Sequence, residues 1–182
     1  MKQALLGIVA LMTVAGSARA NGAGGWGGIF APVVSWDRLE GTFVLPDGSG
    51  MTVGPIQGSA RYRVAGQGKI VLYLDSGFLY IRVDGLSWGL QYPNAPLGSG
   101  LSGEFEGTVV CDSTGRFGPV VWADTPAFEL SQGASLFAGV VALPQACRDR
   151  PEEIVFLLRH ADPANPALYG TFVAYGAGRV IR

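Results

Sequence analysis

Histidine is almost missing from this chain: His160 is the only one in 182 residues. A zinc or copper site built from several imidazole ligands is therefore excluded. A serine–histidine–aspartate triad would have to use His160, because the chain has no other histidine. Because His160 ends a strongly apolar segment, we expect it at a strand end, on the protein surface.

Charged side chains are also scarce. They make up 15% of the chain, whereas about a quarter is usual. The 13 basic and 14 acidic residues nearly cancel, which leaves a net charge of −1. We therefore expect no nucleic-acid partner, because no basic field is present to attract phosphate groups. Low charge combined with 48% hydrophobic residues also argues against a disordered chain.

The motifs that hold ions or phosphates are absent or incomplete. The turns at 47–50 and 112–115 each contain one acid, whereas a calcium site collects about six to eight oxygen ligands. The glycine-rich segments lack the lysine and the following helix of a phosphate loop. We therefore expect no metal and no other cofactor.

Long apolar runs are missing as well, since a membrane-spanning helix needs about 20 apolar residues. The N-terminal run at 4–15 has twelve; Lys2 precedes it, and Ala18-Arg19-Ala20 comes shortly after it. This arrangement is typical of a secretory signal peptide that is cleaved after Ala20, and its short length is bacterial in style. We expect an exported protein, periplasmic or secreted, with no transmembrane anchor in its mature form.

The rest of the chain has the size of one domain. The sequence predicts a signal peptide at 1–20, a flexible glycine-rich tail at 21–30 and a single domain at 31–182. Both cysteines, Cys111 and Cys147, lie in that domain. They lack the C-x-x-C spacing of a redox or metal pair, so in an oxidising compartment they predict a disulfide.

Short apolar segments rich in β-branched and aromatic residues follow one another between turns that contain many of the 28 glycines. No helical apolar stripe extends over ten residues. We expect strands at 31–36, 39–45, 56–64, 69–75, 78–83, 104–112, 119–123, 127–130, 134–143, 153–159 and 168–180, with at most one helical turn in 144–151. About ten short strands predict an all-β, antiparallel β-sandwich, with a closed or partly open β-barrel as the alternative.

A weak internal echo accompanies the strands. The segments 39–44 and 105–110 share an E-G-T core, and at the same offset Ile70 corresponds to Leu136. An ancient duplication would explain the echo. Recurrence of Gly-Thr-Val strands through composition alone is the interpretation that we favour.

Aromatic residues are the main candidates for binding. Trp88 and Tyr92 lie on a predicted surface loop at 84–103, and loops on β scaffolds often carry binding sites. We predict them as a ligand-binding pair for a glycan or a protein partner. Four further aromatics could extend such a platform: Trp36, Tyr73, Tyr80 and Trp122. The simpler interpretation places Trp36 and Trp122 in the core.

Together these features predict a non-catalytic binding or structural module. A secreted hydrolase or isomerase is an alternative, because Glu104 and Glu106 share one strand face and Glu129 could lie beside them. A lipocalin-like carrier is another, and it would require a closed barrel around an apolar cavity.

Overall fold

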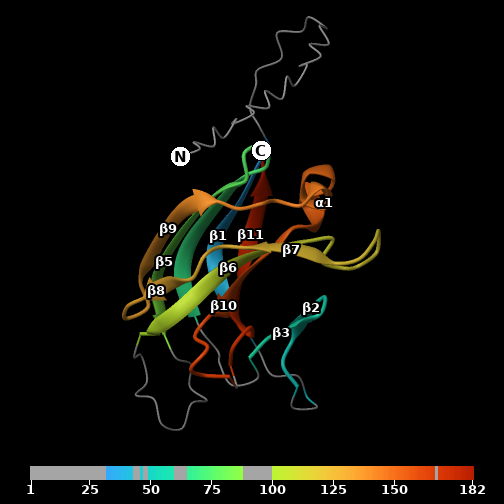
Figure 1. The fold of residues 1–182 in the computed structure, drawn as a ribbon. Helices are drawn as coiled ribbons and strands as arrows, with labels where there is room; N and C mark the ends of the chain where they lie inside the picture. The colour runs from blue at the N-terminus through green and yellow to red at the C-terminus, as the bar shows by residue number, and fades with distance from the viewer. Residues whose placement is uncertain (1–31, 43–45, 47–48, 60–64, 88–99, 167) are drawn as a thin grey trace, which may run out of the picture.

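The computed structural model describes residues 32–42, 46, 49–59, 65–87, 100–166 and 168–182. The predicted signal peptide and tail lie outside these residues. Regular structure in the described part is almost entirely β-strand (Figure 1). The strands are β1 (Val33–Gly41), β2 (Thr52–Val53), β3 (Ile56–Gln57), β4 (Ala65–Tyr73), β5 (Phe78–Ser87), β6 (Gly103–Cys111), β7 (Val121–Asp124), β8 (Phe128–Leu130), β9 (Ser135–Val140), β10 (Val155–His160) and β11 (Phe172–Ile181).

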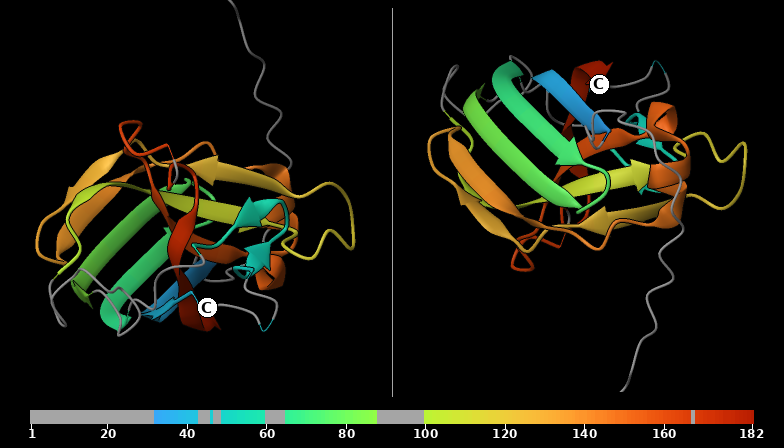
Figure 2. Two further views of the ribbon diagram at one scale, coloured as in Figure 1. Left: turned by 90° about the horizontal axis from the view of Figure 1, so that it is seen from below. Right: turned by 90° about the horizontal axis from the view of Figure 1, so that it is seen from above.

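Nine of these strands form one antiparallel sheet in the order β7-β6-β10-β11-β1-β4-β5-β9, and β8 pairs with β6 beside β7. The sheet curls into a half-barrel (Figure 2). The predicted all-β antiparallel class is therefore confirmed. A single curled sheet corresponds to the partly open barrel, which the sequence left as the alternative to a two-sheet sandwich.

The opposite walls of the curl approach each other at a glycine on β6, which has no side chain to hold them apart. An added Cβ at Gly107, on β6, would meet the side chains of Ile81 on β5 and Phe156 on β10. Gly107 therefore allows β5 to approach β6 across the interior. Such close approach is one reason for glycine within a strand.

At one corner of the curl, a tight turn at 131–134 joins β8 to β9 and is held to neighbouring segments by backbone hydrogen bonds. The Leu86 N–H donates to the Gly133 carbonyl at 3.1 Å, the Gly133 N–H donates to the Leu101 carbonyl at 2.6 Å, and the Leu101 N–H donates to the Leu86 carbonyl at 2.9 Å. Gly133 has a φ of +78°, and an added Cβ there would collide with the Leu86 backbone. Glycine is therefore required at this corner.

A short helix holds the other end of the curl together. Helix α1 (Gln145–Asp149) lies within the predicted helical turn and is followed by a 3₁₀ turn at Pro151–Glu153. The predicted Cys111–Cys147 disulfide joins the end of β6 to α1, with the two Cα atoms 4.8 Å apart. The Arg148 Nε donates to the Leu74 carbonyl at 2.8 Å, which attaches α1 to the β4–β5 turn. In the described part of the chain, no helix is long and apolar enough to span a membrane.

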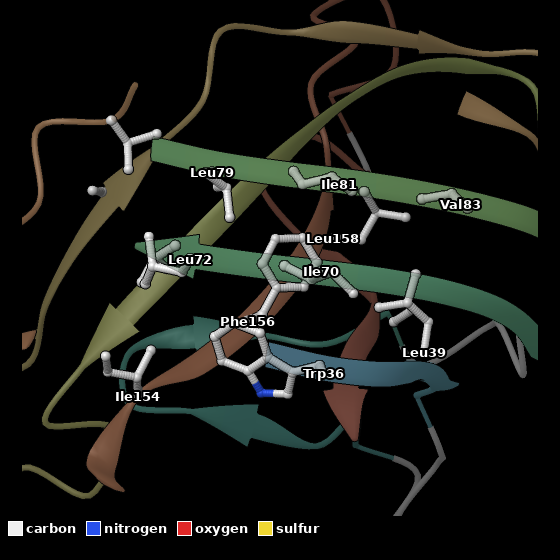
Figure 3. Packing of buried hydrophobic residues seen from close by; sticks show 14 of the residues in the cluster. Trp36, Leu39, Ile70, Leu72, Leu79, Ile81, Val83, Ile154, Phe156 and Leu158 are labelled. Carbon is white, nitrogen blue, oxygen red and sulfur yellow. The ribbon is translucent and has the colours of Figure 1, made fainter. Parts of the chain in front are cut away.

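The interior of the curl is filled with apolar side chains (Figure 3). Trp36, only 1% exposed, lies at its centre with its ring centroid 5.9 Å from that of Phe156. Side chains from β4 and β5, including Ile70 and Ile81, pack against Phe156 and Leu158 of β10. This packing gives no support to the carrier hypothesis, which requires a large enclosed cavity.

A second, smaller core lies on the outer face of β6, β10 and β11. There Ile56 from the β2–β3 hairpin packs with Val110, Leu157 and Phe172. The Ser59 N–H donates to the Phe172 carbonyl at 2.8 Å, which attaches the segment after β3 to β11. The hairpin thus covers one part of the sheet on its outer side.

The structure also separates the segments of the internal echo. The strand β1 lies in the middle of the sheet, whereas β6 lies near one end. Ile70 is fully buried, but its counterpart Leu136 is 64% exposed. The matched residues occupy different environments, so the structure favours recurrence of composition over duplication.

Candidate binding surface

The predicted binding pair, Trp88 and Tyr92, lies outside the described residues, so its role stays a prediction. Two tryptophans lie within the described residues, and their environments differ. Trp36 is a core residue, as expected. Trp122 was expected in the core as well, but it is 41% exposed on β7. Its register partner on β6 is Val110, which faces the outer side of the sheet, and the alternation of β7 turns Ala123 inward instead.

A broad open groove lies on the outer face of the sheet over β4 and β5, with a volume of about 760 Å³. Most of its lining comes from every second residue of β4 and β5, because side chains alternate between the two faces of a sheet. The lining residues are Asp37, Gln67, Gly68, Lys69, Val71, Tyr73, Phe78, Tyr80, Arg82 and Asp84.

One end of the groove is aromatic. Tyr73 and Phe78 lie at the hairpin end of β4 and β5, with their ring centroids 6.0 Å apart, and both are exposed. Tyr80 is the next outward residue on β5 and is directly opposite Val71 on β4. Three rings and one branched side chain therefore form a continuous apolar surface that faces solvent.

The other end of the groove is polar. Lys69 lies opposite Arg82, and Gln67 lies opposite Asp84. The Arg82 Nε is 2.8 Å from the Asp84 Oδ2, but both side chains are largely exposed, so this ion pair contributes little stability. With Asp37 included, the groove contains two basic and two acidic side chains. It offers donors and acceptors without a net charge.

A second depression, of about 420 Å³, continues the groove onto β9. Tyr80 and Arg82 line both depressions, and Leu136 adds an exposed apolar side chain. The outer surface of β4, β5 and β9 is therefore one continuous face.

The carboxylates considered for catalysis lie elsewhere, over β6. Glu104 is directly opposite Glu129 in the pairing of β6 with β8, and both are exposed. Glu106 is half-buried, and its Oε1 lies 3.2 Å from the Arg159 Nη1, which is also 3.2 Å from the Asp124 Oδ1. None of these residues lines either of the two depressions.

Burial raises the pKa of Glu106, and the neighbouring Arg159 guanidinium partly opposes this shift. The Thr108 hydroxyl donates to the Asp124 Oδ1 at 2.6 Å. This cluster is therefore internally paired. Within the described residues, no three histidine, cysteine or acidic side chains come together in a way that could hold a metal ion.

His160 ends β10, as expected, but its predicted surface position is wrong. It is only 9% exposed, and its ring centroid lies 4.6 Å from that of Phe105. Burial lowers its pKa from 6.5 to about 4, so the ring is neutral at pH 7. The period of two along Phe156, Leu158 and His160 was the signal for this inward orientation.

Sequence reasoning named Tyr73 and Tyr80 but missed the groove that joins them to Lys69 and Arg82. The alternation of residues 67, 69, 71 and 73 with buried neighbours contains the necessary signal. This signal indicates a groove only once β4 is known to pair with β5, because that pairing places the outward-facing side chains of the two strands side by side. Comparison of the chain with known protein families, characterised proteins and solved structures gives no match.

Proposed function

We propose that this protein is an exported, non-catalytic binding domain whose ligand is an uncharged glycan held on the outer face of β4 and β5. The continuous aromatic and polar groove is the observation that carries the proposal. Sugar rings have apolar faces and polar edges, and binding sites combine aromatic contacts with a few oriented polar groups.

The dimensions and the charge of the groove both favour this ligand. The outward row from Gln67 to Tyr73 extends over about 20 Å, given a rise of about 3.4 Å per residue. Such a length suits an extended chain better than a compact small molecule. The balance of Lys69 and Arg82 against Asp37 and Asp84 favours a neutral ligand over an anionic one.

Export is part of the proposal. It is supported by the predicted signal peptide and by the Cys111–Cys147 disulfide, which is compatible with an oxidising compartment. Expression of the full chain in a bacterium with a periplasm, followed by N-terminal sequencing, tests it. We expect a periplasmic product that begins at Asn21, and retention of uncleaved chain in the cytoplasm would contradict export.

Affinity electrophoresis in gels that contain neutral glucans, xylans or mannans tests the ligand class, and isothermal titration with the matching oligosaccharides measures the affinity. We expect retardation by at least one neutral glycan. Tyr80→Ala should weaken that binding by about tenfold or more, because central aromatic contacts dominate such interfaces. Tyr169→Ala is the matched control, since Tyr169 is exposed but lies outside the groove.

The test also includes anionic polysaccharides and proteins as competing ligands. Retardation only by anionic chains, or equal losses from Tyr80→Ala and Tyr169→Ala, would contradict a neutral glycan in this groove. The absence of retardation across the panel, with correctly folded protein, would refute the glycan assignment.

A further inference from the structure

The polar end of the groove contains two cations that lie side by side. Lys69 on β4 and Arg82 on β5 are register partners, and both side chains are exposed on the outer face of the sheet. Residues directly opposite each other in an antiparallel pair have Cβ atoms about 5 Å apart, and like charges in this position are destabilising. A contribution to the stability of the fold therefore does not explain this pair.

The Arg82 guanidinium is oriented by its own strand. Its Nε donates to the Asp84 Oδ2 at 2.8 Å, and Asp84 is the next outward residue of β5. This bond leaves the two terminal nitrogens, Nη1 and Nη2, without a hydrogen-bond partner among the described residues. Because the guanidinium is planar and rigid, fixing Nε also fixes the direction of the other N–H groups. Arg82 thus presents oriented donors to the groove.

The Lys69 ammonium has no partner in the described part of the chain. It forms neither an ion pair nor a side-chain hydrogen bond there, although Asp37 lines the same groove. An ammonium group carries three N–H donors and no acceptor. Unused donors from two adjacent strands therefore meet above the polar end of the groove.

These donors lie directly beside the apolar part of the groove. The next outward register pair is Val71 with Tyr80, two residues and about 7 Å along the strands. A glycan that packs one sugar unit on Tyr80 therefore places a neighbouring unit over Lys69 and Arg82. Aromatic contacts hold the apolar face of a sugar, whereas a few placed polar groups provide the specificity of a binding site. The donor pair is the part of the groove that can distinguish one arrangement of hydroxyls from another.

Given a neutral glycan in the groove, as proposed above, we infer that Lys69 and Arg82 select chains with two free hydroxyls on neighbouring carbons of one sugar unit. In 1,4-linked chains of glucose, xylose or mannose, the hydroxyls at C2 and C3 are both free and adjacent. In a 1,3-linked chain, the two free ring hydroxyls of an inner unit flank the linkage, and the next unit stands between them. Two donors that lie side by side therefore fit the 1,4-linked chains.

The acidic residues of the groove favour hydroxyls over a carboxylate as the acceptors. The Asp84 carboxylate already accepts from Arg82, and Asp37 lines the groove on the side of β4 that faces β1. An anionic sugar would meet both acids, and like charges brought together on binding cost affinity. Hydroxyls avoid this repulsion, and they can also donate to the same carboxylates.

Isothermal titration with 1,4-linked and 1,3-linked hexasaccharides of glucose, xylose and mannose tests the selection. We expect at least one 1,4-linked chain to bind about tenfold or more tightly than the 1,3-linked chain of the same sugar, which corresponds to about one or two hydrogen bonds. Lys69→Met should reduce this ratio of affinities to within about threefold, since it removes one of the two donor groups. Lys69→Arg keeps a donor and should retain the ratio. Tyr80→Ala should weaken both linkages by similar factors.

Arg116→Met is the matched control, because it removes an exposed cation outside the groove and should leave the ratio unchanged. Lys69→Met should keep the midpoint of thermal unfolding within about 3 °C of the wild type; a larger decrease would assign Lys69 to the fold and overturn the selection.

Equal binding of both linkages would also overturn it, as would a ratio that Lys69→Met leaves unchanged or that Arg116→Met reduces equally. These outcomes leave the proposed glycan function intact. The absence of binding to every neutral chain would instead refute that function together with the selection.

Discussion

The outer surface of the curled sheet differs between its two halves. Over β6, β10 and β11 it is covered by the β2–β3 hairpin and forms a second apolar core. Over β4, β5 and β9 it is bare and carries the groove. Both halves share the same inner core (Figure 3). The half that has a cover is thus built for stability, and the half without one is available for binding.

This difference is visible in the strand sequences. The residues Phe156, Leu157 and Leu158 of β10 are consecutive and all buried, because that strand is covered on both faces. The strand β5 instead alternates buried residues such as Ile81 with outward ones such as Tyr80. A continuous apolar run predicts a cover on both sides, and alternation predicts a free face. The following predictions test this comparison.

The largest effect is expected in the covered half. Phe172→Ala removes a fully buried ring from the second core and should lower the free energy of unfolding by about 3–5 kcal/mol. Urea unfolding, followed by circular dichroism, measures the loss. A loss below about 1 kcal/mol would mean that the hairpin covers this half without stabilising it.

The second-largest loss of stability is expected from removal of the disulfide that links the two halves. The Cys111–Cys147 disulfide connects β6 of the covered half to the helix that follows β9 of the bare half. Replacement of both cysteines by alanine should lower the free energy of unfolding by about 2–4 kcal/mol. Hydrogen exchange should report weaker protection in both halves, and a loss confined to one half would show that they unfold independently.

His160 should make the stability depend on pH. Its pKa is 6.5 in the reference state and about 4 in the folded protein, so the unfolded chain binds more protons between these values. Stability should therefore decrease as the pH falls from about 6.5 to about 4, by up to about 3 kcal/mol. Because carboxylates also titrate in this range, the measurement is the difference between the wild type and His160→Phe, which keeps the ring contact with Phe105. A difference that is constant with pH would refute this role.

The smallest effect is expected in the bare half. Tyr73→Ala removes an exposed ring whose main aromatic neighbour is Phe78, and it should cost less than about 1 kcal/mol. Thermal unfolding compared with the Phe172→Ala protein provides the measurement. Equal losses from the two variants would remove the distinction between a covered half that contributes most of the stability and a bare half that contributes little.

The fold could be predicted to the level of its class because local patterns determine strands and turns. Alternation, turn residues and the even cysteine pair predicted most of the β-strands, the disulfide and the helical turn around Cys147, although the two strands expected at 31–36 and 39–45 are the single strand β1. The choice between a sandwich and a partly open barrel depends on which strands pair across long distances. Local patterns do not contain the pairing of β1 with both β4 and β11.

The candidate binding surface was predictable only in part. Tyr73 and Tyr80 were named as aromatic residues, but Lys69 gave no signal by itself, because its proximity to Arg82 follows from strand register. His160 was predicted at the surface because it ends a strand, whereas the alternation along β10 directs its side chain inward. Trp122 was misplaced because a large aromatic residue is more often buried than exposed, whereas β7 is an edge strand whose outer face is partly open.

The pairing of β1 with β11 determines when the fold can be completed. These strands lie side by side in the middle of the sheet, and Val33 and Arg182 exchange two backbone hydrogen bonds of 2.9 Å (Figure 1). One edge of β1 therefore has no partner strand until residues near 180 have been synthesised. Contacts between such distant residues form slowly. The pairing of β1 with β11 therefore cannot form until nearly the whole chain has been translated, although the contacts at the Gly133 corner involve only earlier residues.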